Sequence, residues 1–321
     1  MLRRLLPVPL VLLLGATLVA CGGDDSGEEG SGSESSSSSG SPALDSLTIE
    51  GEVGSSPEVT FDGEVQADDV EVEVVDEGDG DEVAAGDSVL THIWIGNGFE
   101  QEKAFSTYDA ETPQLFTVDE EMLSEFFIQG LEGQKIGSRV AVAASSETAF
   151  GEAGNAQLGI GNKDAVVAVI DLLSAVPDGP EGEEQDAPSW APSLVGDESA
   201  PTGLDFAGTP KPDDQLRSDY LIEGEGDPVE KGQTIVVDYL GQVFDGKQPF
   251  DESFSAQPTS FQIGVGGVVK GWDETLVGAP VGSRVIMALP PKFGYGEKGN
   301  EQAGIKGTDT LYFVVDVLAA N

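Results

Sequence analysis

The stretch Ile136-Gly137-Ser138-Arg139-Val140 returns later in the chain as Val281-Gly282-Ser283-Arg284-Val285. It lies inside a longer repeat, in which three further segments recur in the same order: Glu77–Gly80 as Glu223–Gly226, Phe150–Glu152 as Tyr295–Glu297, and Val169–Asp171 as Val314–Asp316. A long internal repeat of this kind is typical of one fold used twice. We therefore expect two copies of one domain.

The spacing between the copies changes once along the chain. Glu77 and Glu223 lie 146 positions apart, whereas Ile136 and Val281 lie 145 positions apart. The first copy is therefore expected to carry one extra residue, in the segment between Gly86 and Phe105.

Apolar residues alternate within each copy as they do in half-buried strands. Ile235, Val237 and Tyr239 share one face of a predicted strand, and residues 310–318 form a β-branched and aromatic run of strand length. Residues 270–279 carry apolar side chains at helical spacing, which predicts one short helix. Each copy is expected to be an α+β domain, in which an antiparallel β-sheet wraps one short α-helix.

Two segments have the composition of connections rather than of cores. One is almost entirely Gly, Ser, Asp and Glu, which predicts a disordered stalk, and the other is rich in Pro, Glu and Asp, which predicts a linker. The expected organisation is a signal sequence at 1–20, the stalk at 21–44, a first domain at 45–176, the linker at 177–200 and a second domain at 201–321.

The first residues have the features of an export signal. Arg3 and Arg4 precede an apolar run that is short and marked by proline. The run ends in Leu18-Val19-Ala20-Cys21, which resembles a bacterial lipobox; a plain secretory cleavage site is the alternative. We expect Cys21 to carry lipid and to anchor the protein at the extracytoplasmic face of the bacterial cell membrane. Cys21 is the only cysteine, so no intramolecular disulfide can form.

The composition is strongly acidic, with 15 Lys and Arg against 59 Asp and Glu and a formal net charge of −44. Loss of residues 1–20, which contain two arginines and no acid, would leave 13 basic against 59 acidic residues, or −46. Such a surface repels nucleic acid and anionic lipid headgroups, so neither is an expected partner. The acidic run at 76–81 lacks the glycine that an EF-hand requires at its sixth position, and no metal site or cofactor is expected.

Seven short motifs follow one another in the second copy. They are Val237–Gly241, Asp245–Lys247, Phe250–Ser253, Phe261–Gly264, Val268–Trp272, Gly294–Gly296 and Leu311–Val315. In this order and spacing they resemble the FKBP family of peptidyl-prolyl cis-trans isomerases, over roughly residues 205–321.

The resemblance implies a site, residue by residue. Trp272 would form the floor of an apolar pocket that takes the proline ring. Tyr295 would donate its hydroxyl to a substrate carbonyl, and the Val269 backbone N–H would hold another. Asp251 would lie at the pocket edge, hydrogen-bonded to the Tyr239 phenol. The walls would come from Tyr239, Phe250, Val268, Val269 and Phe313.

Such a pocket suits rotation about an X-Pro peptide bond, which breaks no covalent bond. The barrier of about 18–20 kcal/mol is mostly lost amide resonance, and a twisted amide is less polarised than a planar one. A dry apolar pocket therefore favours the transition state over the ground state. The expected activity is isomerisation in exported proteins, with proline-containing unfolded or extended polypeptides as partners. A non-catalytic peptide-binding or chaperone-like lipoprotein is the alternative.

Two positions depart from the family's pattern. Thr259 stands where the family often has a further pocket aromatic. The arginine that commonly pairs with the pocket aspartate is missing from residues 254–257. Both changes bear on substrate preference.

The repeat carries the pocket positions into the first copy, where most of them change. By sequence, Tyr239 corresponds to Ile93, Asp251 to Ser106, Trp272 to Phe127, Tyr295 to Phe150, Phe313 to Ala168, and Phe250 to Phe105. We expect the first copy to keep the fold, to lack the isomerase site, and to have one pocket wall left short at Ala168. Its role as a binding or chaperone-like module or as a spacer stays open.

Overall fold

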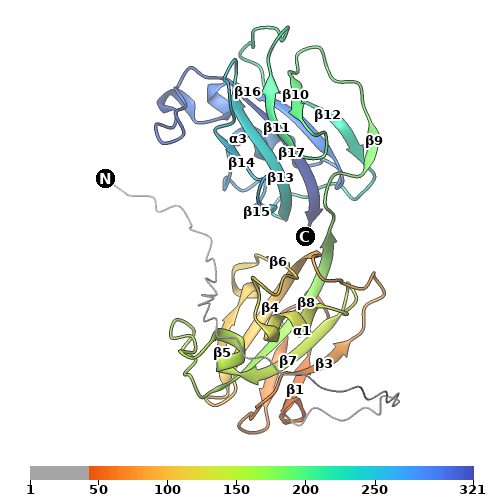
Figure 1. Ribbon diagram of the computed structural model, residues 1–321, viewed down its shortest axis with the longest axis vertical. Coiled ribbons are helices and arrows are strands. Elements are labelled where there is room, and N and C mark those ends of the chain that lie inside the picture. The colour runs from red at the N-terminus through yellow and green to blue at the C-terminus, as the bar shows by residue number, and fades with distance from the viewer. Residues whose placement is uncertain (1–42) are drawn as a thin grey trace, which may run out of the picture.

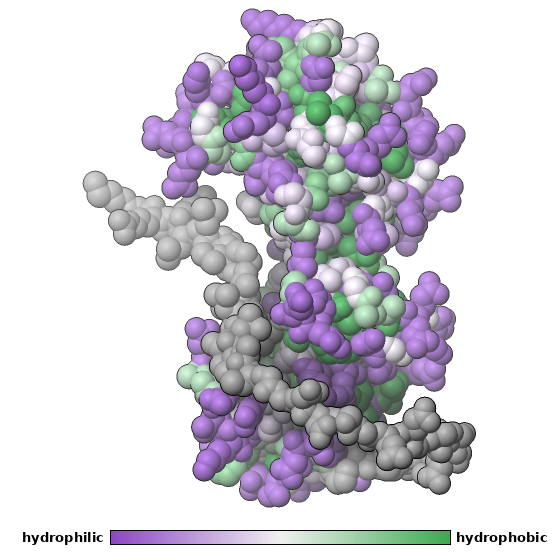
Figure 2. Space-filling model, viewed as in Figure 1, coloured by the Kyte–Doolittle hydropathy of each residue, from purple (hydrophilic) through white to green (hydrophobic). Residues whose placement is uncertain are grey.

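The computed structural model describes residues 43–321, which form two main sheets, each with its own core, and two separate two-stranded hairpins (Figure 1). The predicted signal sequence, Cys21 and nearly all of the predicted stalk lie outside the described residues. Among residues 43–321, no helix has the length and apolar character needed to cross a membrane. Figure 2 shows hydrophilic side chains around the periphery of both domains, in keeping with the acidic composition.

The first domain consists mainly of strands. Its elements are η1 (Leu44–Ser46), β1 (Leu47–Glu50), β2 (Glu58–Phe61), β3 (Glu71–Asp76), β4 (Ser88–Asn97), β5 (Glu102–Ser106), η2 (Thr107–Ala110), β6 (Gln114–Thr117), α1 (Glu125–Leu131), β7 (Arg139–Ser145), α2 (Ser146–Phe150) and β8 (Ala165–Val176). The main sheet is antiparallel with the order β3-β7-β8-β4-β5, and β6 also pairs with β4.

The second domain repeats this arrangement. Its elements are β9 (Gly182–Glu184), β10 (Ser193–Gly196), β11 (Pro201–Asp205), β12 (Arg217–Gly224), β13 (Thr234–Val243), β14 (Asp251–Glu252), β15 (Thr259–Gln262), α3 (Lys270–Thr275), β16 (Arg284–Leu289), η3 (Pro291–Phe293), η4 (Gly296–Lys298) and β17 (Leu311–Ala320). The antiparallel sheet has the order β14-β13-β17-β16-β12-β9, with β15 paired to β13.

The expectation of one helix per domain is wrong for the first domain. The second domain has the single α-helix α3, whereas the first has both α1 and α2. The Ser145 hydroxyl caps α2 by accepting a hydrogen bond from the Thr148 amide. The corresponding residue of the second domain is Pro290, which has no such side-chain cap, and the chain there turns through η3 instead.

Each main sheet carries a β-hairpin on the face opposite its helix. The hairpin β1–β2 packs around Trp94 of β4, and the hairpin β10–β11 packs around Tyr312 of β17. The expected linker at 177–200 is therefore wrong as a free connection, because it contains β10 and also β9, which pairs with β12. The physical reason is that Trp190 and Leu194 pack against the apolar outer face of the second sheet.

A buried arginine–aspartate pair ties each hairpin to its sheet. Arg139 Nε donates to Asp171 Oδ1 at 2.7 Å, and Arg284 Nε donates to Asp316 Oδ1 at 2.6 Å. Each arginine also donates to backbone carbonyls in the turn of its own hairpin: Arg139 to Gly51, Glu52 and Ser55, and Arg284 to Glu198 and Ser199. The repeated Gly-Ser-Arg-Val stretch therefore belongs to the shared frame of the two domains.

Candidate functional site

Four aromatic rings meet on the inner face of the second sheet. Trp272, in the first turn of α3, is 3% exposed. Its ring centroid lies 5.3 Å from that of Tyr239, 5.5 Å from that of Phe261 and 5.5 Å from that of Phe313. The interplanar angles are 82°, 87° and 81°, so all three contacts are edge-to-face, an arrangement that aromatic rings favour.

The local sequence explains how α3 comes so close to the sheet. The helix begins after Val269, an N-cap residue with extended backbone (φ −63°, ψ 143°). A Cβ added to Gly271 would lie 2.4 Å from Leu289 Cδ2 on β16. Glycine at this position therefore permits the approach that brings Trp272 to the floor of the site.

A second glycine makes room for the walls. A Cβ on Gly241 would lie 2.6 Å from Phe313 Cε1 and 2.7 Å from Phe250 Cζ. The two phenylalanine rings themselves meet edge-to-face, with centroids 5.7 Å apart. Gly241 lies opposite Phe313 across β13 and β17, and opposite Asp251 across β13 and β14. One glycine thus admits both aromatic walls.

The polar groups lie at the edge of the aromatic pocket. The Tyr239 hydroxyl donates to Asp251 Oδ2 at 2.8 Å, which is the hydrogen bond expected from the sequence. Burial, and then the hydrogen bond to Asp251, raises the pKa of Tyr239 above its ordinary value. Tyr295 is 38% exposed, and burial raises its pKa as well. Both phenols therefore remain protonated donors at neutral pH.

The structure brings the residues predicted from the sequence together. Tyr239, Phe250, Val268, Val269, Trp272 and Phe313 belong to one apolar cluster. Asp251 joins it through Tyr239, and the pKa of Tyr295 is raised mainly by burial and to a smaller extent by the Asp251 charge. Phe261 also belongs to the pocket and was not among the predicted site residues. Its position in a predicted strand, directly before Gln262-Ile263-Gly264, was the signal that could have identified it.

Comparison with known proteins agrees with this geometry. The family model described as FKBP-type peptidyl-prolyl cis-trans isomerase matches residues 80–173 and 226–318, together more than half of the chain. The chain belongs to this family. It is accordingly a peptidyl-prolyl cis-trans isomerase with a repeated FKBP fold.

Two bacterial relatives align over about the length of one domain. The chain is similar to the FK506-binding protein of Streptomyces anulatus, with 37% identity over 117 residues that cover 36% of this chain and 94% of that protein. It is also similar to the probable FK506-binding protein of Corynebacterium glutamicum, with 34% identity over 111 residues, 35% of this chain and 91% of that protein. Among solved structures, the three FKBP domains of wheat FKBP73 align with 78% of this chain and 94% of that chain, at 18% identity and a TM-score of 0.32.

Strand pairing corrects the alignment of the two FKBP domains at the pocket edge. Asp251 lies opposite Gly241 in the second domain. In the first domain, Phe105 lies opposite Ile95, which is the residue that corresponds to Gly241. Phe105, and not Ser106, therefore holds the position of Asp251. The first domain has an aromatic ring where the second has a carboxylate.

A conserved hydrogen bond supports this register. The Thr107 hydroxyl accepts from the Ile93 amide at 2.8 Å, just as the Ser253 hydroxyl accepts from the Tyr239 amide at 2.9 Å. The extra residue of the first domain therefore follows Thr107, and its expected position before Phe105 is wrong. The extra residue lies in the connection between β5 and β6, since Gln114 follows Thr107 by seven positions and Thr259 follows Ser253 by six.

The buried pair at the centre of the pocket is reversed between the FKBP domains. Gly241 lies opposite Phe313, whereas Ile95 lies opposite Ala168. Ile95 and Ala168 are both 0% exposed and belong to one core cluster. The expectation that Ala168 leaves a wall short is therefore wrong, because the larger residue on the neighbouring strand compensates. Ala104 likewise takes the place of Phe250, in correction of the expected match to Phe105.

The same exchange of large and small residues occurs between the helix and the strand that it packs against. Phe126 of α1 takes the place of Gly271, and Ala144 of β7 takes the place of Leu289. Phe127, which corresponds to Trp272, stacks on Phe116 with ring centroids 5.6 Å apart. The first FKBP domain therefore fills its interior with a different set of side chains and has no indole at the pocket floor.

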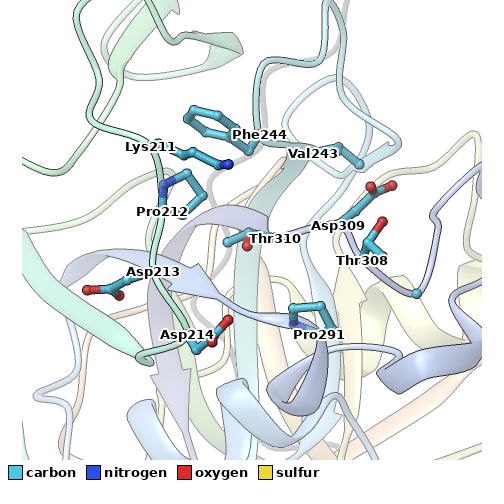
Figure 3. Close-up of a pocket in the computed structure, with 11 residues that line it drawn as sticks. Lys211, Pro212, Asp213, Asp214, Val243, Phe244, Pro291, Thr308, Asp309 and Thr310 are labelled. Atoms are coloured by element: carbon cyan, nitrogen blue, oxygen red, sulfur yellow. The ribbon is translucent and has the colours of Figure 1, made fainter.

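Another hollow lies on the second FKBP domain (Figure 3). It has a volume of about 630 Å³ and is lined by Lys211, Pro212, Asp213, Asp214, Val243, Phe244, Pro291, Gly307, Thr308, Asp309 and Thr310. These residues include none of the predicted site. Within residues 43–321, no group of three or more His, Cys, Asp and Glu side chains could hold a metal ion. The mixed charges of this hollow offer no apolar enclosure for a proline ring.

Proposed function

We propose that the second FKBP domain carries the isomerase activity and acts on X-Pro bonds of exported polypeptides. The observation that carries this proposal is the difference between the two domains in the residues at the pocket floor and at the pocket edge. Trp272 lies among edge-to-face aromatics beside the hydrogen-bonded pair Tyr239–Asp251, whereas Phe127 lies beneath an edge that holds Phe105. A proline ring needs an apolar enclosure and the flanking carbonyls need donors, and the second domain supplies both.

The pocket would act by binding the twisted amide better than the planar one. Trp272 and its neighbouring rings enclose the proline and exclude water, which favours the less polarised transition state. The Tyr295 phenol, which is protonated at neutral pH and whose pKa burial raises further, would donate to a substrate carbonyl. The Val269 amide, at the N-cap of α3, would hold a second carbonyl. No nucleophile or proton transfer is required.

The proposal extends to the location of the enzyme. Residues 1–20 would be removed, and an acylated Cys21 would anchor the chain at the extracytoplasmic face of the cell membrane. This part of the proposal is supported by the amino-acid sequence of residues 1–21. Uncatalysed X-Pro isomerisation takes tens of seconds or longer, so an anchored isomerase would speed folding where exported chains emerge.

The catalytic assignment is tested with a matched pair of substitutions in the full-length chain. Trp272→Leu should lower kcat/KM by at least about tenfold in a protease-coupled prolyl-peptide assay, because it opens the pocket floor. Phe127→Leu makes the corresponding change in the first domain and should leave kcat/KM unchanged. Equal losses in the two variants, with both still folded, would show that the pocket has been assigned to the wrong domain.

The anchor is tested by cell fractionation. Cys21→Ser removes the only thiol that could be acylated, so the protein should leave the membrane fraction. Retention in the membrane with normal signal processing would refute the anchor at Cys21.

A further inference from the structure

The two FKBP domains pack against each other through apolar side chains. Leu90 and Val176 of the first domain and Val236, Leu318 and Ala319 of the second form one buried cluster. Strand β9, shortly after the junction, is paired with β12 at the edge of the second sheet. The apolar cluster and the pairing of β9 with β12 therefore hold the two domains in a fixed orientation at their junction.

Beside this cluster, the first domain reaches the segment that borders the aromatic pocket. Gln257 Nε2 donates to Met122 Sδ at 3.3 Å. Gln257 belongs to the connection between Asp251, at the pocket edge, and β15, in the pocket wall. Met122 is nevertheless 45% exposed, so nearly half of its surface remains open to a ligand.

The wall of the aromatic pocket has only a small side chain at the start of β15, next to the segment that Met122 contacts. Thr259 and Phe261 are two residues apart on β15, so their side chains point to the same face of the strand. Phe261 packs edge-to-face on Trp272, whereas Thr259 offers only a small side chain on that face. Gln257 lies two residues before Thr259, a span of at most about 7 Å, so Met122 contacts the chain next to this gap.

We propose that Met122 of the first domain is a substrate-binding residue of the second domain's site, where it contacts a large apolar side chain next to the substrate proline. The inference rests on the proposed function of the second domain and adds a substrate class to it: extended polypeptides with Leu, Ile, Phe or Met flanking the proline. Methionine suits this role because its unbranched thioether adapts to differently shaped partners. Leu123, its neighbour in the chain, is partly buried and packs against the first core.

The test compares peptides of equal length with either Leu or Ala beside the proline, using the full-length chain. Met122→Ala should raise KM for the Leu peptide about fivefold, the effect expected from losing the burial of roughly one methylene group, and leave the Ala peptide unchanged. Met122→Leu keeps an apolar side chain and should behave as wild type. Phe99→Ala removes another exposed apolar side chain of the first domain, 52% exposed, and should change neither peptide.

A binding measurement separates this inference from the proposed function. Peptide affinity, measured by titration against the intrinsic tryptophan fluorescence, does not depend on turnover. A wild-type chain that binds peptide without isomerising it would overturn the proposed function alone, and the same fivefold selective loss in Kd would still support Met122. Equal affinities of wild type and Met122→Ala for the Leu peptide would overturn the inference. So would an equal loss for both peptides, because it would indicate a purely structural role.

Discussion

The two FKBP domains share one frame and differ in what fills it. Both pair the repeated arginine with a buried aspartate, and both use that arginine to hold the turn of a hairpin. Inside, Gly241 faces Phe313 in the second domain, whereas Ile95 faces Ala168 in the first. The first domain has therefore not simply lost its pocket side chains. It has large and small residues exchanged across the same strands, so both positions remain buried while the aromatic pair of the second domain is absent.

Removing one partner of the buried ion pair should have the largest effect, and it should be alike in the two domains. Asp171→Ala leaves Arg139 charged and buried, and Asp316→Ala does the same to Arg284. Each should lower the free energy of unfolding of its own domain by about 3–5 kcal/mol. Denaturant unfolding followed by tryptophan fluorescence and circular dichroism measures this loss.

The control is an exposed pair in the same chain. Asp213→Ala breaks the surface pair with Arg217 and should leave the unfolding curve almost unchanged, because solvent screens it. If Asp171→Ala and Asp316→Ala were as mild as this control, the buried pairs would not be what holds the frame.

The reversed packing can be broken and then restored within the first domain. Ala168→Phe adds a ring against Ile95 and should destabilise the domain by about 1–3 kcal/mol. The double variant Ile95→Gly/Ala168→Phe recreates the pair of the second domain and should recover part of that loss. A double-mutant cycle from unfolding curves measures the coupling. Purely additive effects would mean that the two positions do not compensate each other.

The sequence was sufficient for the repeated fold and for most of the pocket. The Gly-Ser-Arg-Val repeat, the strand alternation and the seven motifs placed Trp272, Tyr239 and Asp251 correctly. It was not sufficient for the segment at 177–200, because a short hairpin among Pro and Glu residues gains its structure from packing on a sheet that lies far along the chain. Packing of this kind leaves no local periodicity.

The residue of the first domain that corresponds to Asp251 could not be predicted from the sequence, for a different reason. The phenylalanines at 105 and 250 align well as letters, but the extra residue of the first domain follows Thr107, so Phe105 holds the position of Asp251. A register difference of one residue changes which face a side chain takes without changing the residue types around it.

Removal of one phenol should separate the two domains by activity. Tyr295→Phe deletes the hydroxyl proposed to hold a substrate carbonyl, so kcat/KM should fall about tenfold, or about 1–2 kcal/mol, without a change in unfolding. Phe150→Leu alters the corresponding position of the first domain and should have no effect on turnover. Unchanged kcat/KM for Tyr295→Phe would remove this phenol from the site.

The smallest expected effect concerns pH. Burial lowers the pKa of His92, against the opposing charge of Asp171, from the ordinary value of 6.5. The unfolded chain therefore binds the proton more readily, and the first domain should lose stability as pH falls below about 6.5. Asp238 holds this position in the second domain, and burial raises its pKa, so its contribution is lost as pH rises instead. Unfolding curves of wild type and His92→Gln across this range should differ in slope; parallel slopes would contradict it.

The division of labour between the domains is tested most directly by assaying residues 43–176 and residues 177–321 separately on a short peptide with Ala beside the proline. The second piece begins at 177 because β9 and the hairpin β10–β11 belong to its sheet. Circular dichroism confirms first that each piece is folded. We predict that residues 177–321 retain nearly the kcat/KM of the full-length chain and that residues 43–176 give no rate above the uncatalysed one. Comparable turnover by residues 43–176 would contradict the assignment of the active site to the second domain.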